Sequence, residues 1–194
     1  PINEVTLFFN NKLIRGNRST KSHADGFDAF SSPNLSPLLE AGINIQINGA
    51  EINKQPEGEF TVNDITPQPI GVVTMYPGIS AEVIKNTLRQ PVNAMILLTF
   101  GVGNAPQNPE LLAQLKDASE RGVVVVNLTQ CLSGKVNMGG YATGCALAEA
   151  GVISGYDMTP EAALAKLHYL LSQNLSYEQV KDQMQQVLRG EMSL

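Results

Sequence analysis

Two continuous apolar runs constrain the fold of this chain more than any other feature. AMILLTF at 94–100 and VVVVNLTQ at 123–130 hold apolar residues at successive positions, so each strand would bury side chains on both of its faces. An antiparallel strand with one face in water would instead alternate apolar and polar residues. Helical patterns separate and follow these runs, and the sequence therefore predicts a parallel sheet covered on both faces, beginning at about Ile70.

Capping residues mark where the helices of this part begin. Ser80 precedes AEVIKNTLR, Asn108 precedes Pro109 and LLAQLKDASERG, and Ser176 with Gln179 forms the pattern of a capping box. ATGCALAEAG and the segment after Thr159 are also expected to be helical. The positions expected on the buried faces of the first and last of these helices are Val83, Ile84, Thr87 and Leu88, and Val180, Met184, Val187 and Leu188.

The residues before this sheet have a different composition. VTLFF and KLIRG read as two short strands joined by a tight turn at Asn10-Asn11, SSPNLSPLLEAG as a short helical turn ending at Gly42, and INIQINGAEI as an exposed strand. The segment 49–69 is rich in proline and polar residues. We therefore expect an α/β protein in which 1–48 is the end of an amino-terminal domain, 49–69 a linker, and 70–194 a complete smaller α/β domain.

Charge and composition exclude several classes of protein. The net charge of −5 offers no basic surface for a phosphate backbone, so nucleic acid is not an expected partner. No apolar run approaches the length of about 18 residues that spans a bilayer, and the start of the chain lacks the basic and small residues of a signal peptide, so no membrane is expected and the predicted location is the cytoplasm. Cys131 and Cys145 have no metal-ligand spacing and are read as free thiols.

Three glycine-rich loops should meet at one edge of the predicted sheet. YPGIS, GVGNAPQN and QCLSGKVNMGGY each follow a strand, and in an open α/β sheet ligands bind at the carboxyl ends of the strands. The loops could simply turn the chain, but their common edge favours a binding site or an interface. GVGNAPQN is neither a phosphate loop nor a dinucleotide fingerprint, because Pro106 stands where the third glycine is needed, so no nucleotide cofactor is expected.

Four polar side chains are candidates for chemistry. His23 and His168 have no acidic partner at ligand spacing and are expected to be packed or solvent-facing. Cys131 follows a strand, but no base is in view to activate it as a nucleophile. Lys21 is either a solvated surface charge or, if dehydrated beside a hydroxyl and a carboxylate, a base.

Long stretches of the sequence resemble one enzyme family. GNRSTK, GVVTMYPGIS, FGVGNAPQN and VVVVNLTQCLSGKVNMGGYATG are similar, in this order and over essentially the whole chain, to bacterial L-asparaginases of the cytoplasmic type I group. The resemblance implies hydrolysis of L-asparagine to L-aspartate and ammonia without a metal or an organic cofactor. It also implies a homodimer or a homotetramer.

The resemblance gives Lys21 a specific role. In this family a lysine of a threonine, aspartate and lysine triad follows a threonine in a loop after a hairpin, and RSTK places it at Lys21. Partial burial would favour the neutral, proton-accepting form of this side chain. The family's two nucleophile threonines and its triad aspartate lie in motifs, TGGTI and HGTDT, that these 194 residues do not contain. We therefore expect the carboxy-terminal part of a type I asparaginase that is inactive by itself.

Some cytoplasmic members of the family bind asparagine at a second, regulatory site near the subunit interface. By motif position, the resemblance suggests Thr20, Asn104 and Cys131 as effector or interface residues. Leu98 stands in the strand where an arginine is expected to hold the effector's carboxylate. A different reading of the chain is a non-catalytic module that binds amino acids or only drives oligomerisation.

Overall fold

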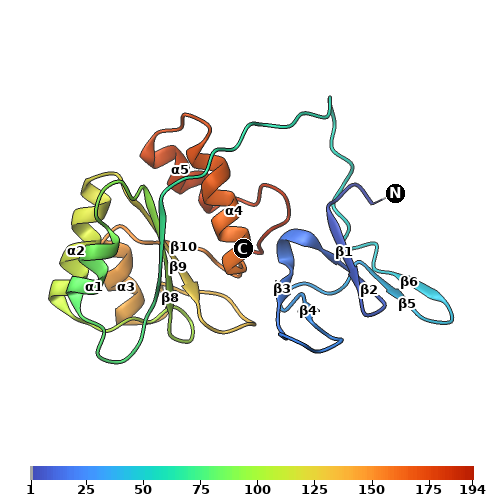
Figure 1. The fold of residues 1–194 in the computed structure, drawn as a ribbon, viewed down its shortest axis with the longest axis horizontal. Coiled ribbons are helices and arrows are strands. Elements are labelled where there is room, and N and C mark those ends of the chain that lie inside the picture. The colour runs from blue at the N-terminus through green and yellow to red at the C-terminus, as the bar shows by residue number, and fades with distance from the viewer. Residues whose placement is uncertain (1) are drawn as a thin grey trace.

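The computed structural model describes residues 2–194. A parallel sheet with its helices lies to one side in Figure 1, and a group of antiparallel strands lies to the other, joined by a long irregular segment. Helix α4 and the residues after α5 lie between the two groups (Figure 1). The fold-class prediction of an α/β protein with a parallel-sheet domain is confirmed.

The parallel sheet has four strands in the order β10-β9-β8-β7. The strands are β7 (Ile70–Thr74), β8 (Ala94–Thr99), β9 (Val124–Thr129) and β10 (Ile153–Ser154). The two apolar runs became the two central strands, β8 and β9, which pair in parallel from Ala94 opposite Val124 to Thr99 opposite Thr129. Being central, they are buried on both faces, as their unbroken hydrophobicity requires.

Helices cover the two faces of this sheet in separate groups. Those on one face are α1 (Ala81–Thr87), α2 (Pro109–Glu120) and α3 (Ala142–Glu149), and those on the other are α4 (Pro160–Leu171) and α5 (Tyr177–Met184). Leu97 points into the first core and Ile96 into the second, both fully buried. A buried aliphatic side chain of this size stabilises the fold by about 1.5–3 kcal/mol relative to an exposed one.

Two expectations about buried helix faces were wrong. Ile84 and Leu88 are buried, but Val83 is 38% exposed because it lies toward solvent on the short helix α1. Val180 and Met184 are buried, whereas Val187 is 45% exposed because α5 ends at Met184, so the helical repeat no longer governs the residues that follow.

The amino-terminal part is built of short antiparallel strands. One sheet has the order β1-β2-β5-β6, and β3 pairs with β4 beside it. The strands are β1 (Thr6–Phe9), β2 (Lys12–Arg15), β3 (Thr20–Lys21), β4 (Phe30–Ser31), β5 (Leu39–Ala41) and β6 (Ile45–Ile47), and the single-turn helix η1 spans Gly16–Arg18. Asn10 and Asn11 both have positive φ, 46° and 58°, which matches the predicted tight turn between β1 and β2.

The predicted helical turn before Gly42 is wrong. Leu39–Ala41 forms the strand β5 instead, with Leu39 opposite both Leu13 of β2 and Ile47 of β6. Pairing on both sides satisfies the backbone groups that a local turn would have satisfied, so tertiary contact overrode the local sequence signal.

The segment 49–69 contains no helix or strand and is largely exposed. Its last residues nevertheless attach to α4, because the Thr66 amide donates to Ser172 Oγ (3.0 Å) and the Gln68 amide donates to His168 Nδ1 (3.0 Å). We retain the division into 1–48, 49–69 and 70–194 as a proposal. Within residues 2–194, no helix has both the length and the hydrophobicity needed to cross a membrane.

Candidate functional site

The carboxyl ends of the parallel strands face a cavity of about 300 Å³. Thr74, Leu98 and Thr129, at the ends of β7, β8 and β9, line it. The side-chain amide of Gln130 donates to the carbonyl oxygens of Met75 (2.8 Å) and Leu98 (2.9 Å). This residue therefore ties together the ends of all three strands, at the edge where their loops were expected to meet.

A buried polar pair fixes the loop that follows β8. Thr99 Oγ1 donates to Asn127 Oδ1 (2.6 Å), and Asn127 Nδ2 donates to the Gly103 carbonyl (3.0 Å). Gly103 has a φ of 109°, and a Cβ added there would lie 2.8 Å from a methyl group of Val136. The glycine is thus needed both for its backbone conformation and for the close approach of Val136.

Other residues that line the cavity come from the amino-terminal part and from the start of α4. These are Thr20, Asn34 and Thr159. Asn34 Oδ1 accepts from the Gly134 amide (2.8 Å), and Asn34 Nδ2 donates to the Asp157 carbonyl (3.1 Å). The cavity is therefore formed only when two parts of the chain, far apart in sequence, pack together.

The structure brings together two of the three residues suggested as effector or interface positions. Thr20 and Cys131 both line the cavity. Asn104 is not among the lining residues, and its Oδ1 accepts from Thr143 Oγ1 of α3 (2.5 Å). Asn104 thus holds its own loop against a helix, and a ligand-binding role for the three residues stays a prediction.

Lys21 lies at the end of β3, directly after the cavity-lining Thr20. Its side chain is exposed, and Nζ lies 4.8 Å from the centroid of the Phe30 ring. The family resemblance led us to expect partial burial of Lys21, and residues 2–194 do not provide it. The backbone position is well defined, because Lys21 pairs with Phe30 and the neighbouring Ser22 amide donates to the Ala29 carbonyl (2.8 Å).

The two histidines have local roles. His23 is exposed, and its Nδ1 accepts from the Gly26 amide (2.9 Å). His168 Nδ1 accepts a hydrogen bond from the Gln68 amide and so holds the segment that leads into β7. Within residues 2–194, no group of three or more histidine, cysteine, aspartate or glutamate side chains is placed to hold a metal ion.

The lining of the cavity contains no cationic side chain. Leu98 occupies the position where an arginine was expected. The residues that line the cavity are Thr20, Asn34, Thr74, Leu98, Thr129, Gln130, Cys131, Leu132, Gly134, Met158, Thr159 and Pro160. A carboxylate placed here would be desolvated without a positive partner from the lining, which is unfavourable.

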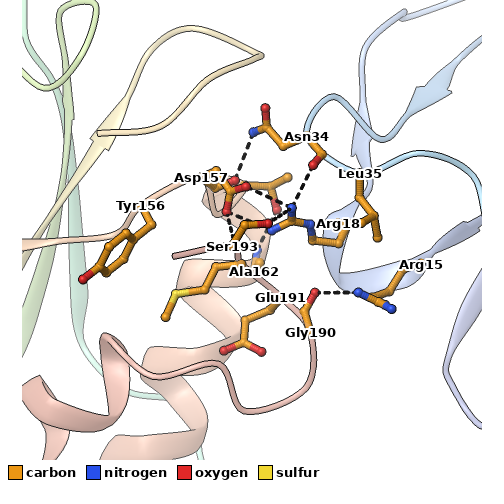
Figure 2. Close-up of polar contacts among 12 residues, drawn as sticks. Arg15, Arg18, Asn34, Leu35, Tyr156, Asp157, Ala162, Gly190, Glu191 and Ser193 are labelled. Carbon is orange, nitrogen blue, oxygen red and sulfur yellow. Dashed lines mark hydrogen bonds and ion pairs between the residues drawn. The ribbon is translucent and has the colours of Figure 1, made fainter. Parts of the chain in front are cut away.

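A buried ion pair lies beside the cavity and connects the two parts of the chain (Figure 2). Arg18 Nη1 and Nη2 donate to the two carboxylate oxygens of Asp157, each at 2.9 Å. Only 2% of the Arg18 side chain and 8% of the Asp157 side chain are exposed. Sequence reasoning missed this pair, because no spacing rule relates residues 139 positions apart, although Arg18 stands inside the GNRSTK stretch singled out above.

Comparison with known families identifies the chain. Residues 69–184, more than half of it, match the glutaminase/asparaginase C-terminal domain, and residues 1–53 match the asparaginase N-terminal domain. The chain belongs to the asparaginase family. The resemblance drawn from its motifs is thereby confirmed.

Individual proteins similar to this asparaginase chain include two bacterial L-asparaginases and a human lysophospholipase. L-asparaginase 1 of Escherichia coli (strain K12) is 68% identical over 193 residues, which is 100% of this chain and 57% of that protein. The crystal structure of L-asparaginase I from Vibrio cholerae O1 biovar eltor str. N16961 has a TM-score of 0.96 and 84% identity, covering 100% of this chain and 59% of that one. The human 60 kDa lysophospholipase is 48% identical over 195 residues, 99% of this chain and 34% of that protein.

The asparaginase chain therefore spans somewhat more than half the length of the two bacterial proteins. It is a type I L-asparaginase homologue that corresponds to their carboxy-terminal portion with part of the amino-terminal domain.

Proposed function

We propose that the protein acts as an L-asparagine amidohydrolase, converting asparagine to aspartate and ammonia, and that this chain contributes Lys21 and the smaller domain. The observation that carries the proposal is the 68% identity with E. coli L-asparaginase 1 along the whole chain. The RSTK motif, which carries the family's triad lysine, supports the assignment of Lys21.

In this proposal Lys21 moves a proton. Its neutral amine would accept the proton of a threonine hydroxyl, or of the water that attacks the acyl intermediate, through the aspartate of the triad. Lys21 is exposed in the described chain, so its ammonium is accessible to a further protein segment packed against β3. Such a segment would exclude water from the amine and favour the neutral form.

The nucleophile threonines and the aspartate would come from residues outside these 194. We therefore expect the chain by itself to release no ammonia from asparagine. The family's organisation as a homodimer or homotetramer and its cytoplasmic location are parts of the same proposal, and light scattering measures the first of them.

The test joins this chain to the amino-terminal part of E. coli L-asparaginase 1 that precedes the aligned region. Ammonia release from asparagine is expected from the joined protein, and Lys21→Met should lower kcat by about 10²–10⁴-fold, the usual contribution of a general base. Lys54→Met, which changes an exposed lysine of the 49–69 segment, is the matched control and should leave kcat unchanged. A folded joined protein that releases no ammonia would refute the proposal.

A second candidate function is amino-acid binding without turnover. The cavity lined by Thr20, Cys131 and Thr159 favours it, because it lies within this chain and needs no further segment. Calorimetric titration of the 194-residue chain with asparagine, aspartate and glutamine tests this function. A saturable heat that Thr20→Val abolishes would support the second function, and no heat of binding with any of the three amino acids would refute it.

A further inference from the structure

The residues that follow α5 cross from the parallel-sheet part to the amino-terminal part. On the first side, Glu191 anchors them: its carboxylate accepts from Lys166 Nζ (2.6 Å) and from the amides of Leu188 (3.0 Å) and Arg189 (2.6 Å). Glu191 is only 4% exposed. We call residues 189–193 the strap.

On the other side, the strap is held by three side chains of the amino-terminal part. The Gly190 carbonyl accepts from Arg15 Nη1 (3.0 Å), as Figure 2 shows, and the Arg189 carbonyl accepts from Asn17 Nδ2 (2.9 Å). Ser193 Oγ accepts from Arg18 Nη2 (3.0 Å). Arg15 is itself fixed by an ion pair with Glu4 and by the Glu51 carbonyl (2.5 Å).

The Arg18–Asp157 pair lies at the centre of these contacts. The Ser193 amide donates to Asp157 Oδ1 (2.7 Å), so the strap contacts both members of the pair. Arg18 Nη2 also donates to the Asn34 carbonyl (2.9 Å) (Figure 2). The planar guanidinium donates hydrogen bonds only in the directions set by its fork, so this cluster fixes orientation as well as distance.

The same cluster lies close in sequence to the strand that carries Lys21. Ser19 Oγ donates to the Gly16 carbonyl (2.7 Å), which makes the connection from Arg18 to β3 tight. Thr20 Oγ1 then donates to Glu161 Oε1 in the first turn of α4 (2.7 Å). Since Asp157 lies two residues before Thr159, the N-cap of α4, the ion pair and this hydrogen bond attach β3 to the same short stretch of chain.

We propose that the strap and the buried Arg18–Asp157 pair position β3, so that Arg18, Asp157 and Ser193 are positioning residues for Thr20 and Lys21. The claim that these residues support turnover rests on the proposed function. Their effect on the position of β3 is independent of that function.

Hydrogen exchange of the 194-residue chain tests the structural part. The double variant Arg18→Met with Asp157→Leu removes both charges together, so no unpaired buried charge remains and the chain is expected to stay folded. Amides of 20–31 should exchange about tenfold faster than in the original chain, while amides of β8 and β9 keep their rates. Unchanged exchange at 20–31 in the folded double variant would overturn the proposal.

A matched control removes another pair of the same residue types. Asp117 of α2 and Arg121, the residue after this helix, form an exposed ion pair at 2.7 Å, remote from β3 in the fold. Arg121→Met with Asp117→Leu should leave the exchange of 20–31 unchanged. Faster exchange there in the control would also count against the proposal, because the effect would then not be specific to the Arg18–Asp157 pair.

Kinetics of the protein joined to the E. coli amino-terminal part test the catalytic part. In the Arg18→Met, Asp157→Leu variant kcat should fall about tenfold or more with little change in KM, because the base is misplaced. A variant that is only less stable would keep its kcat when assayed below its unfolding midpoint. Equal kcat values would overturn the catalytic part. An inactive joined protein before any substitution would instead refute the proposed function, and the exchange measurement would still decide whether the strap positions β3.

Discussion

At the scale of single residues, Lys166 carries a charge whose burial is compensated by a compact set of acceptors. Its Nζ donates to Glu191 (2.6 Å) and to the carbonyls of Met184 (3.1 Å) and Gln186 (2.5 Å). Burial lowers the pKa of Lys166 by more than the ion pair with Glu191 raises it. For Glu191 burial would raise the pKa, but hydrogen bonds from Lys166 and from the backbone outweigh it and lower the pKa.

Removing the charge of Glu191 while Lys166 keeps its own should destabilise the fold. Glu191→Gln leaves Lys166 buried without its counter-charge, and we expect a loss of about 3–5 kcal/mol in the free energy of unfolding, measured by urea denaturation. Glu178→Gln, which changes an exposed carboxylate 3.8 Å from Lys181 Nζ, is the control and should change stability by less than about 1 kcal/mol. Similar losses in both variants would contradict this account of the buried pair.

The carboxylates of Glu4 and Glu191 should make the fold sensitive to acid. Burial would raise the pKa of Glu4, but hydrogen bonds from Arg15 and the Asn53 amide lower it, so Glu4 and Glu191 both titrate below their usual value of 4.5 in the folded chain. Between each folded pKa and 4.5 the unfolded state binds more protons, so stability is fully present above 4.5 and falls as the pH drops through the folded values. Urea midpoints measured from pH 7 to pH 3 should show this decline, and it should be shallower in Glu4→Gln. Midpoints that rise on acidification would contradict it.

At the scale of elements, two serines at helix starts look equivalent in sequence but differ in the structure. Ser176 Oγ accepts from the Gln179 amide (3.3 Å), and Gln179 Oε1 accepts from the Ser176 amide (2.9 Å), completing the capping box of α5. Ser80 has the extended backbone of an N-cap, but its side chain makes no capping hydrogen bond to α1.

This difference predicts unequal effects of the same substitution. Ser176→Ala should lower the free energy of unfolding by about 1 kcal/mol, because an amide of the first turn loses its acceptor. Ser80→Ala should change it by only a few tenths, since the side chain satisfies no helix amide. Urea denaturation of the two variants measures both values, and an equal loss would show that the serine at position 80 caps α1 in solution.

At the scale of the whole molecule, the segment 49–69 joins the two parts in two different ways. Residues 54–62 are exposed, whereas residues 63–68 hydrogen-bond to α4 and to the residues just after it, with Thr66 bonded to Ser172 and Gln68 to His168. The first stretch acts as a tether, and the second belongs to the packed surface.

Insertions should distinguish these two stretches. A short Gly-Ser insertion between Glu57 and Gly58 should cost less than about 0.6 kcal/mol, because loop-closure entropy grows slowly with length. The same insertion between Thr66 and Pro67 should cost about 1–3 kcal/mol, since the bonds to Ser172 and His168 can no longer both form in register. Calorimetric melting of the two proteins gives the comparison, and equal losses would mean that the attached end contributes nothing.

Much of the fold was predictable because its signals are local. The apolar runs of β8 and β9, the caps Asn108 and Ser176, and the Asn10-Asn11 turn each act within a few residues of chain. Strand β5 was missed because its pairing with β2 and β6 lies outside its own sequence, and the short β10 because two residues give no period.

The candidate site divides along the same line. The RSTK motif predicts a role for Lys21 that stays a prediction, and the ends of the strands predicted the edge of the sheet at which the cavity lies, because both kinds of information lie along the chain. Of the three loops, the one after β9 lines this cavity and the other two do not. The sequence by itself thus determined the parallel sheet, its helices and the family. Only the tertiary structure decided that Thr20 and Cys131 share a cavity while Asn104 does not, and that Arg18 meets Asp157 across 139 residues. The physical reason is that periodicity and capping report free energies within one element, whereas a desolvated charge is stabilised by whichever partner the packing of distant elements brings to it.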